Sequence, residues 1–231
     1  MLILLSVAIA PSLALISYFY LRSEFLKEPS RLLLHSFIYG AILTFPILFV
    51  QYVFTVEHVF AHAYTQDVLF PGLTEEFFKW LILLLVIYRH VDFEVPYDGI
   101  LYGASAALGF ATVENIFYLL EYGIDIAFLR ALLPVSSHAL FGVVMGYYLG
   151  KAKFPGRQGA RSWLAAALAA PLGLHILYNS ILFMENTWLQ LIIPFMLFLW
   201  WFALRKVKQS HQMSLVHYQE RVAAAVQPND R

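Results

Sequence analysis

Seven long apolar runs decide what this chain can fold into. They cover approximately residues 2–21, 32–54, 73–89, 98–121, 130–150, 162–184 and 187–204. Each run is close to the length of about 20 residues that a helix needs to cross the hydrocarbon core of a bilayer. Over the whole chain, 61% of the residues are hydrophobic and 13% are charged, which excludes an ordinary soluble domain. We therefore expect an all-α protein, a polytopic transmembrane helix bundle with about seven spans.

The end of the last apolar run divides the chain into two parts. We expect a membrane-embedded domain over residues 1–204 and a polar cytoplasmic tail over residues 205–231, which we also expect to be poorly ordered. The first run lacks a basic segment before it, so we interpret it as a retained helix and not as a signal peptide. The chain has no cysteine, which excludes thiolate metal ligands and a cysteine nucleophile. With 15 basic and 15 acidic residues, the charge gives no indication of nucleic acid as a partner.

The basic residues predict the orientation, because lysine and arginine accumulate in cytoplasmic loops. Placing the N-terminus outside the cell brings 13 of the 15 to the cytoplasmic side: Arg22, Lys27, Arg31, Arg89, Lys151, Lys153, Arg157, Arg161, Arg205, Lys206, Lys208, Arg221 and Arg231. The predicted outer loop, residues 55–72, contains none of them. We therefore expect the N-terminus outside and the C-terminus in the cytoplasm.

Three ionisable groups lie at a similar predicted depth below the outer surface. From the helical rise of about 1.5 Å per residue, Glu114 lies roughly 10 Å deep, His138 roughly 12 Å and His175 roughly 13 Å. Ionisable groups at such depths usually face the protein interior or a wet cavity and usually serve a function. We expect the three to contribute to one site that opens to the outside.

The segment PGLTEEFFKW adds two glutamates and a lysine. If the helix begins at Leu73, it is too short to span the bilayer, so that its outer end, with Glu75 and Glu76, is recessed towards the histidines. The preceding VLFPG suits a chain that dips into the membrane before this helix. The alternative is that Thr74 caps the helix and the glutamates only favour its first turn. Lys79 lies close enough in sequence to pair with one glutamate, which leaves the other free to act as a general base on water.

The two histidines occur in proline-bent helices. His138 follows PVSS, and Pro134 frees a backbone carbonyl one turn earlier. His175 and Asn179 share a helix face in PLGLHILYN and could donate hydrogen bonds to an oxyanion. Taken alone, either histidine is as well explained by packing or by an interhelical hydrogen bond.

The stretch GFATVENIFY supplies Glu114 and Asn115, which we interpret as supporting residues, with Glu114 also a candidate ligand. A purely structural role for them is nearly as well supported. The G-x-x-x-G series formed by Gly142, Gly146 and Gly150 is typical of close helix packing, and we assign it to packing alone.

Several known intramembrane chemistries lack their motifs. The sequence has no H-E-x-x-H zinc motif, no G-x-S-G serine motif and no pair of intramembrane aspartates. Ser136 and Ser137 beside His138 are a weak option for a serine nucleophile, because sequence neighbours diverge on a helix. A site made of glutamates and histidines remains.

Five segments together carry a resemblance to a known family: TEEFFK, GFATVENIFYLLEYG, ALLPVSSHALFGVVMGYYLGKA, HILYN and FMLFLWWFALRK. They resemble the PrsW family of bacterial membrane-embedded proteases, which make the first cut in anti-sigma factors, and the resemblance extends over nearly the whole chain. More distantly, the paired glutamates and separated histidines are similar to the CAAX-protease superfamily, whose members use a glutamate-activated water. Glu75 and Glu76 match the paired glutamates of the family and His175 its C-terminal histidine. Asn179 stands where the PrsW pattern commonly has aspartate, which favours an oxyanion donor over a metal ligand there.

The resemblance implies a peptidase in the bacterial cell membrane that clips the extracytoplasmic part of a single-pass membrane protein, an anti-sigma factor. In this interpretation Glu75 or Glu76 deprotonates a water, His138 orients it, Lys79 fixes the partner glutamate, and His175 with Asn179 stabilises the oxyanion.

Two alternatives stay open. In the first, zinc is the cofactor and is bound by two or three of Glu75, Glu76, Glu114, His138 and His175. In the second, the same residues bind a proton or cation in a transporter, which would need a polar path through the inner half of the bundle.

Overall fold

The computed structural model describes residues 1–23, 30–154 and 159–226, and these residues form helices joined by short turns, without any strand. The long helices are α1 (Leu2–Leu21), α2 (Ser30–Val56), α4 (Pro96–Tyr122), α6 (Ser136–Lys153), α7 (Ala160–Leu182) and α8 (Trp188–Val226). Helix α6 continues a rod that begins with η3 (Ile124–Ile126), α5 (Ala127–Arg130) and η4 (Ala131–Val135). Among the described residues, six helical segments are long and apolar enough to cross a membrane. The prediction of an all-α, multi-pass bundle is confirmed.

The remaining predicted span, residues 73–89, is also helical but differs from the others. It consists of η1 (Thr65–Leu69), α3 (Phe70–Ile82) and η2 (Leu83–Ile87), and its first and last parts are π-helical. Glu75, Glu76 and Lys79 lie in its middle part and are buried. These three charges distinguish the segment from the six others, and they are buried in the protein.

The expected start of this helix at Leu73 is wrong. The helix begins eight residues earlier, at Thr65, so VLFPG is helical and does not form a separate dip before the helix. Pro71 is the second residue of α3, in the first turn of a helix, where proline is tolerated. Thr74 is not an N-cap, because its hydroxyl donates to the carbonyl oxygen of Phe70 at 2.8 Å within the helix.

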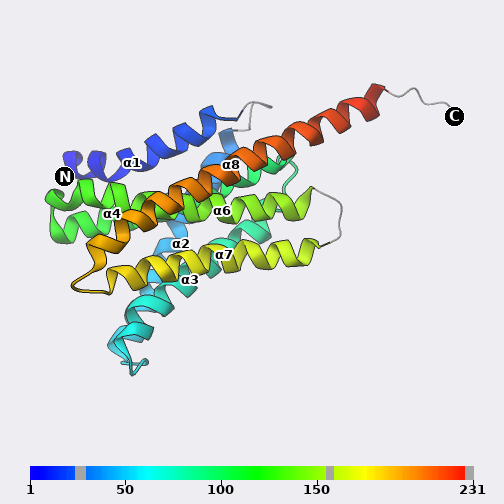
Figure 1. The fold of residues 1–231 in the computed structure, drawn as a ribbon. Coiled ribbons are helices and arrows are strands. Elements are labelled where there is room, and N and C mark those ends of the chain that lie inside the picture. Colours follow the sequence, from blue (N-terminus) through cyan, green and yellow to red (C-terminus); the bar gives the residue numbers. More distant parts are fainter. Residues whose placement is uncertain (24–29, 155–158, 227–231) are drawn as a thin grey trace.

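Helix α4 is the centre of the bundle. It packs most extensively against α6, with α2 and α1 as further neighbours, and α7 lies on the far side of α6 (Figure 1). Small residues bring α4 and α6 close together: a Cβ atom on Gly103 would overlap the carbonyl oxygen of Gly142, and one on Gly146 would overlap that of Gly99. The packing role predicted for Gly142 and Gly146 is therefore confirmed.

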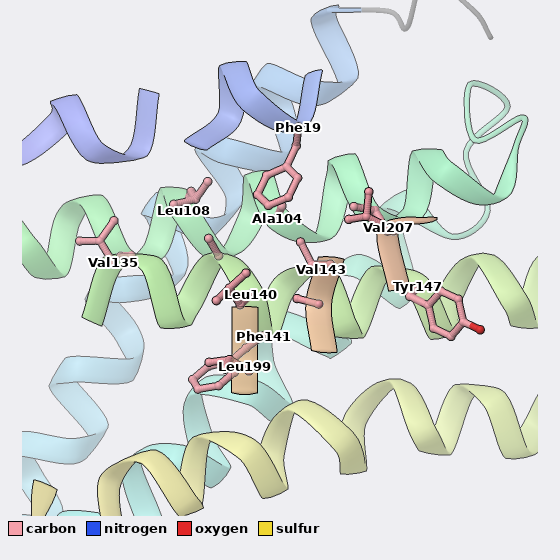
Figure 2. Packing of buried hydrophobic residues seen from close by; sticks show 14 of the residues in the cluster. Phe19, Ala104, Leu108, Val135, Leu140, Phe141, Val143, Tyr147, Leu199 and Val207 are labelled. Atoms are coloured by element: carbon pink, nitrogen blue, oxygen red, sulfur yellow. The ribbon is translucent and has the colours of Figure 1, made fainter. Parts of the chain in front are cut away.

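The main apolar core fills the space between α4, α6 and α8. It contains Leu108 of α4, Leu140 and Phe141 of α6 and Leu199 of α8, all at most 1% exposed (Figure 2). Phe141 also stacks on His175 of α7, with ring centroids 5.1 Å apart. The core thus extends directly to one of the predicted site residues.

The expectation of a poorly ordered tail is wrong for residues 205–226. Helix α8 continues without a break to Val226, and its C-terminal end projects beyond the other helices (Figure 1). The extension is anchored to the start of α4: the backbone N–H of Tyr97 donates to the hydroxyl of Ser214 at 2.9 Å, and the Tyr97 and His211 rings stack 4.1 Å apart. The division at residue 204 stays a prediction that falls inside this helix.

Candidate active site

Four helices bring their ionisable side chains to one place. Glu75 and Glu76 come from α3, Glu114 from α4, His138 from α6 and His175 from α7. The exposed fraction is 0% for Glu76, 7% for Glu75 and 4% for each histidine. The convergence expected from their depths is therefore present.

Glu76 is the most heavily paired member of this cluster. Its Oε1 accepts hydrogen bonds from Lys79 Nζ at 2.8 Å and from His175 Nδ1 at 2.9 Å. Its Oε2 is buried and has no hydrogen-bond partner in the protein. Lys79 thus pairs most closely with Glu76 and more distantly with Glu75, whereas its spacing predicted a pair with only one of them. The second oxygen of Glu76 is left for a ligand or a water.

Glu75 has weaker partners. Its Oε1 lies 3.4 Å from Nε2 of Gln51, while its Oε2 lies 3.6 Å from Lys79 Nζ and 3.9 Å from His138 Nε2. This Oε2 is also buried without a hydrogen-bond partner. Of the two glutamates, Glu75 therefore has the carboxylate that is more available to a reacting molecule.

His138 lies between a carboxylate and an ammonium group. Its Nε2 is 3.0 Å from Oε2 of Glu114, and its Nδ1 is 3.2 Å from Nζ of Lys79. The π-helical turn η4, which contains Pro134, directly precedes α6, and His138 lies in the first turn of α6. The neighbouring hydroxyls of Ser136 and Ser137 are bonded to backbone carbonyls of this turn, so the structure gives no support to a serine nucleophile.

Aromatic rings enclose these polar groups. Phe110 contacts His138 with ring centroids 5.5 Å apart, and Lys79 Nζ lies 4.3 Å from the centroid of the same Phe110 ring. The rings of His138 and His175 lie edge to face, 5.2 Å apart. Because aromatic walls exclude water, the charge interactions between the enclosed groups are stronger than they would be at a surface.

Two predicted residues lie at the edge of the cluster. The amide Nδ2 of Asn179 donates to the carbonyl oxygen of Val68 at 3.4 Å, which ties α7 to η1. Asn115 donates from Nδ2 to the carbonyl oxygen of Ala8 at 3.0 Å and so ties α4 to α1. Both amides thus hold helices together in this structure, and the role of Asn179 as an oxyanion donor stays a prediction.

Sequence reasoning did not identify Gln51 and Arg130 as parts of this site. Gln51 of α2 donates from Nε2 to the Thr74 hydroxyl at 3.0 Å and also approaches Glu75. Arg130 of α5 contacts Asn115 and Glu114. Their only signal in the sequence is that each is a lone polar residue in a long apolar run, which does not indicate the helix face on which it lies.

The cluster has a donor set that fits a metal ion. Glu75, Glu76, His138 and His175 each offer one ligand atom, and these four atoms lie within 4.8 Å of one another. Carboxylate oxygens and imidazole nitrogens are common zinc ligands, and the unpartnered Oε2 atoms of both glutamates provide free donors. The Lys79 ammonium already lies among these groups, so a bound metal would share the cluster with it or displace it.

A buried glutamate and histidine cluster in a multi-pass helical protein is the arrangement that a membrane-embedded hydrolase requires. The model of the family described as "PrsW family intramembrane metalloprotease" matches residues 28–204. The chain therefore belongs to the PrsW family, and it is a peptidase of the bacterial membrane.

Several curated relatives support this assignment. The chain is 47% identical to Protease PrsW of Bacillus subtilis over 92% of this chain and 98% of the relative. It is 49% identical to Protease PrsW of Geobacillus kaustophilus, over 90% and 92% of the two chains. The Clostridioides difficile protein of the same name is 32% identical over 84% and 87%. No solved structure matches this chain.

Proposed function

We propose that this peptidase cleaves the extracytoplasmic part of a single-pass membrane protein, an anti-sigma factor by family resemblance, with a water activated by Glu75. The observation that carries the proposal is the unequal pairing of the two glutamates. Glu76 Oε1 is held by Lys79 at 2.8 Å and by His175 at 2.9 Å, whereas Glu75 lies at 3.4 Å or more from its partners. The carboxylate that lies farther from the cation is the better proton acceptor.

In the proposed reaction, Glu75 takes a proton from the water, and the water oxygen attacks the carbonyl carbon of the scissile peptide bond. His138, which lies 3.9 Å from Glu75 Oε2, orients this water. His175 in its protonated form donates to the tetrahedral oxyanion through Nε2 while Nδ1 stays with Glu76, and Asn179 offers a second donor. When the C–N bond breaks, Glu75 returns its proton to the leaving amine, which gives a carboxyl group and an amino group as products.

The substrate and the side of cleavage can be tested in one assay. We would reconstitute the purified protein in proteoliposomes with a single-pass anti-sigma factor encoded by the same genome and identify the products by mass spectrometry. The proposal expects one cut in the extracytoplasmic segment, close to the membrane. Cuts only in the cytoplasmic segment, or no cut in any such substrate, would contradict it.

Zinc-assisted hydrolysis is a second candidate, favoured by the four ligand atoms that lie within 4.8 Å and by the family description as metalloprotease. Glu75, Glu76, His138 and His175 would hold the ion, which when bound supplies a Lewis acid for the carbonyl and lowers the pKa of a bound water.

Metal analysis separates the two candidates. If the carboxylate acts without a metal, we expect full cleavage after treatment with a chelator. We also expect active protein to contain less than one equivalent of metal. Loss of cleavage on chelation, with recovery on adding zinc, would instead support the second candidate.

A further inference from the structure

Arg130 is a buried charge that the proposed reaction does not use. It lies at the end of α5 with 9% of its surface exposed. A charged residue in a membrane bundle is costly to bury unless it is paired, so its partners indicate what it does. Among the described residues, its guanidinium group contacts Asn115, Tyr118 and Glu114.

These partners fix the guanidinium group on three sides. Its Nε donates to Oδ1 of Asn115 at 2.9 Å, and its Cζ lies 3.7 Å from the centroid of the Tyr118 ring. Its Nη2 lies 3.5 Å from Oε1 of Glu114. Because Asn115 and Tyr118 hold the group in place, the position of its charge beside Glu114 is fixed.

The other oxygen of Glu114 faces the active site. Oε2 of Glu114 lies 3.0 Å from Nε2 of His138, so the two oxygens of one carboxylate connect Arg130 to His138. A guanidinium group stays charged in proteins and stabilises an ionised carboxylate, which can only accept hydrogen bonds. The proton of the His138 ring must then be on Nε2.

The assignment of the proton to Nε2 also determines the state of the opposite ring nitrogen, Nδ1. With the proton on Nε2, Nδ1 carries a lone pair, and Lys79 Nζ lies 3.2 Å from it as a donor. Both ring nitrogens thus have a partner of the right kind, and the ring has one orientation and one tautomer. Lys79 alone already keeps the lone pair on Nδ1, so the contribution of Glu114 is a fixed acceptor that holds the ring at Nε2.

We propose that Arg130 is a positioning residue of the active site, which acts through Glu114 to fix the orientation of the His138 ring. This inference rests on the proposed role of His138 in the reaction. In either candidate mechanism the water or the metal ion would take the place of Lys79 at Nδ1, while Glu114 holds the ring at the far nitrogen, Nε2.

The test uses the full-length protein in nanodiscs, with Arg130→Met as the main variant. We expect a fall in kcat of about 10- to 100-fold with KM within about threefold, since loss of an outer-shell partner typically costs this much. Arg130→Lys keeps the charge and should recover part of the lost kcat, whereas Glu114→Gln should lose as much as Arg130→Met. Arg221→Met, which breaks the exposed pair with Glu94 at 3.2 Å, is the matched control and should keep the wild-type kcat.

A second readout follows the ring itself. In protein labelled with ¹⁵N-histidine, the His138 signals are those that disappear in His138→Gln. We expect the wild type to show a single set of signals, from one tautomer in one ring orientation, and Arg130→Met and Glu114→Gln to show several sets or broadened signals, because the ring is no longer held at Nε2. If Arg130→Met does not fold, Arg130→Lys and Glu114→Gln carry the same test.

The outcomes distinguish this inference from the proposed function. If Arg130→Met and Glu114→Gln keep both kcat and the single set of signals while His138→Gln loses cleavage, the inference is wrong and the proposed function stands. If His138→Gln itself cleaves at the wild-type rate, the proposed role of His138 is wrong.

Discussion

At the scale of single residues, Lys79 is the cation that makes the acidic cluster compatible with burial. Its side chain is 2% exposed and contacts Glu76, Glu75 and His138. Two adjacent carboxylates in the interior would otherwise repel each other and lack a counter-charge. Removing one partner of a buried pair is costly because the remaining charge stays buried.

Lys79→Met should therefore lower the free energy of unfolding by about 3–5 kcal/mol. The double variant Lys79→Met with Glu76→Gln should recover much of this loss, because it removes both charges of the closest pair. The measurement is thermal unfolding in detergent of the two variants and the wild type. A double variant that is less stable than Lys79→Met would contradict this account of the pair.

For single residues, the sequence predicts how deep a side chain lies in the membrane but not the direction in which it points from its helix. Glu114, His138 and His175 were placed at one level by counting residues along their helices, and the structure brings them together. Counting cannot tell which face of a helix turns inward, so Gln51 and Arg130 were missed. Asn179 was expected at the reacting atoms because it shares a face with His175, but its amide bonds to the carbonyl oxygen of Val68.

At the scale of elements, the packing of α4 against α6 determines how closely the helix that carries Glu114 approaches the helix that carries His138. Each helix presents glycines to the carbonyl oxygens of the other, and no side chain fits between them. This contact was predictable for α6 from its glycine spacing. On α4 the small-residue run GASAALG, residues 103–109, also predicts a close helix contact, but the sequence does not show that α6 is the partner.

Gly146→Ala should destabilise the protein by about 1–3 kcal/mol, because the added methyl group forces α4 and α6 apart. The cleavage rate should fall as well, since His138 on α6 and Glu114 on α4 lie in hydrogen-bond contact. Gly173→Ala on α7 is the control, because its Cβ would meet no atom within 4 Å. Equal free energies of unfolding of the two variants would show that the close approach of α4 and α6 does not stabilise the protein.

The extension of α8 was missed because its composition is polar. Its buried residues Val207, Ser210 and Ser214 are spaced three and four apart, which is the spacing of one helix face. Two of the three are serines, so hydropathy alone does not mark the face. The contact with the start of α4 explains why this polar segment is helical.

Ser214→Ala should lower the free energy of unfolding by about 1–3 kcal/mol, because it removes the buried hydrogen bond between the Ser214 hydroxyl and the backbone N–H of Tyr97. Gln219→Ala, on the exposed side of the same helix, should have no effect beyond about 0.5 kcal/mol. Both are read by thermal unfolding in detergent. Equal melting temperatures would mean that the extension does not support α4.

At the scale of the whole molecule, the orientation in the membrane decides which substrate segment reaches the site. The seven apolar runs predicted the helices, because length and hydropathy are sufficient for that. The orientation rests on the basic residues alone and is still a prediction. The absence of cysteine makes it directly testable, because a single introduced cysteine is the only thiol.

Ala61→Cys and Gln219→Cys are suited to this test, since both positions are exposed and lie on opposite sides in the predicted orientation. In intact cells, a membrane-impermeant maleimide should label Ala61→Cys and not Gln219→Cys. After the cells are opened, both should react. Labelling of Gln219→Cys alone in intact cells would reverse the orientation and the predicted side of cleavage.

The most direct test of the central claim is the cleavage rate of Glu75→Gln, Glu76→Gln and His175→Ala beside the wild type in proteoliposomes that contain the membrane-anchored substrate. If these side chains form one hydrolytic site, each variant that retains the wild-type helix content should cleave at least about 100-fold more slowly, which is the lower range for loss of a general base. Cleavage by all three variants within a few-fold of the wild-type rate would show that hydrolysis takes place elsewhere.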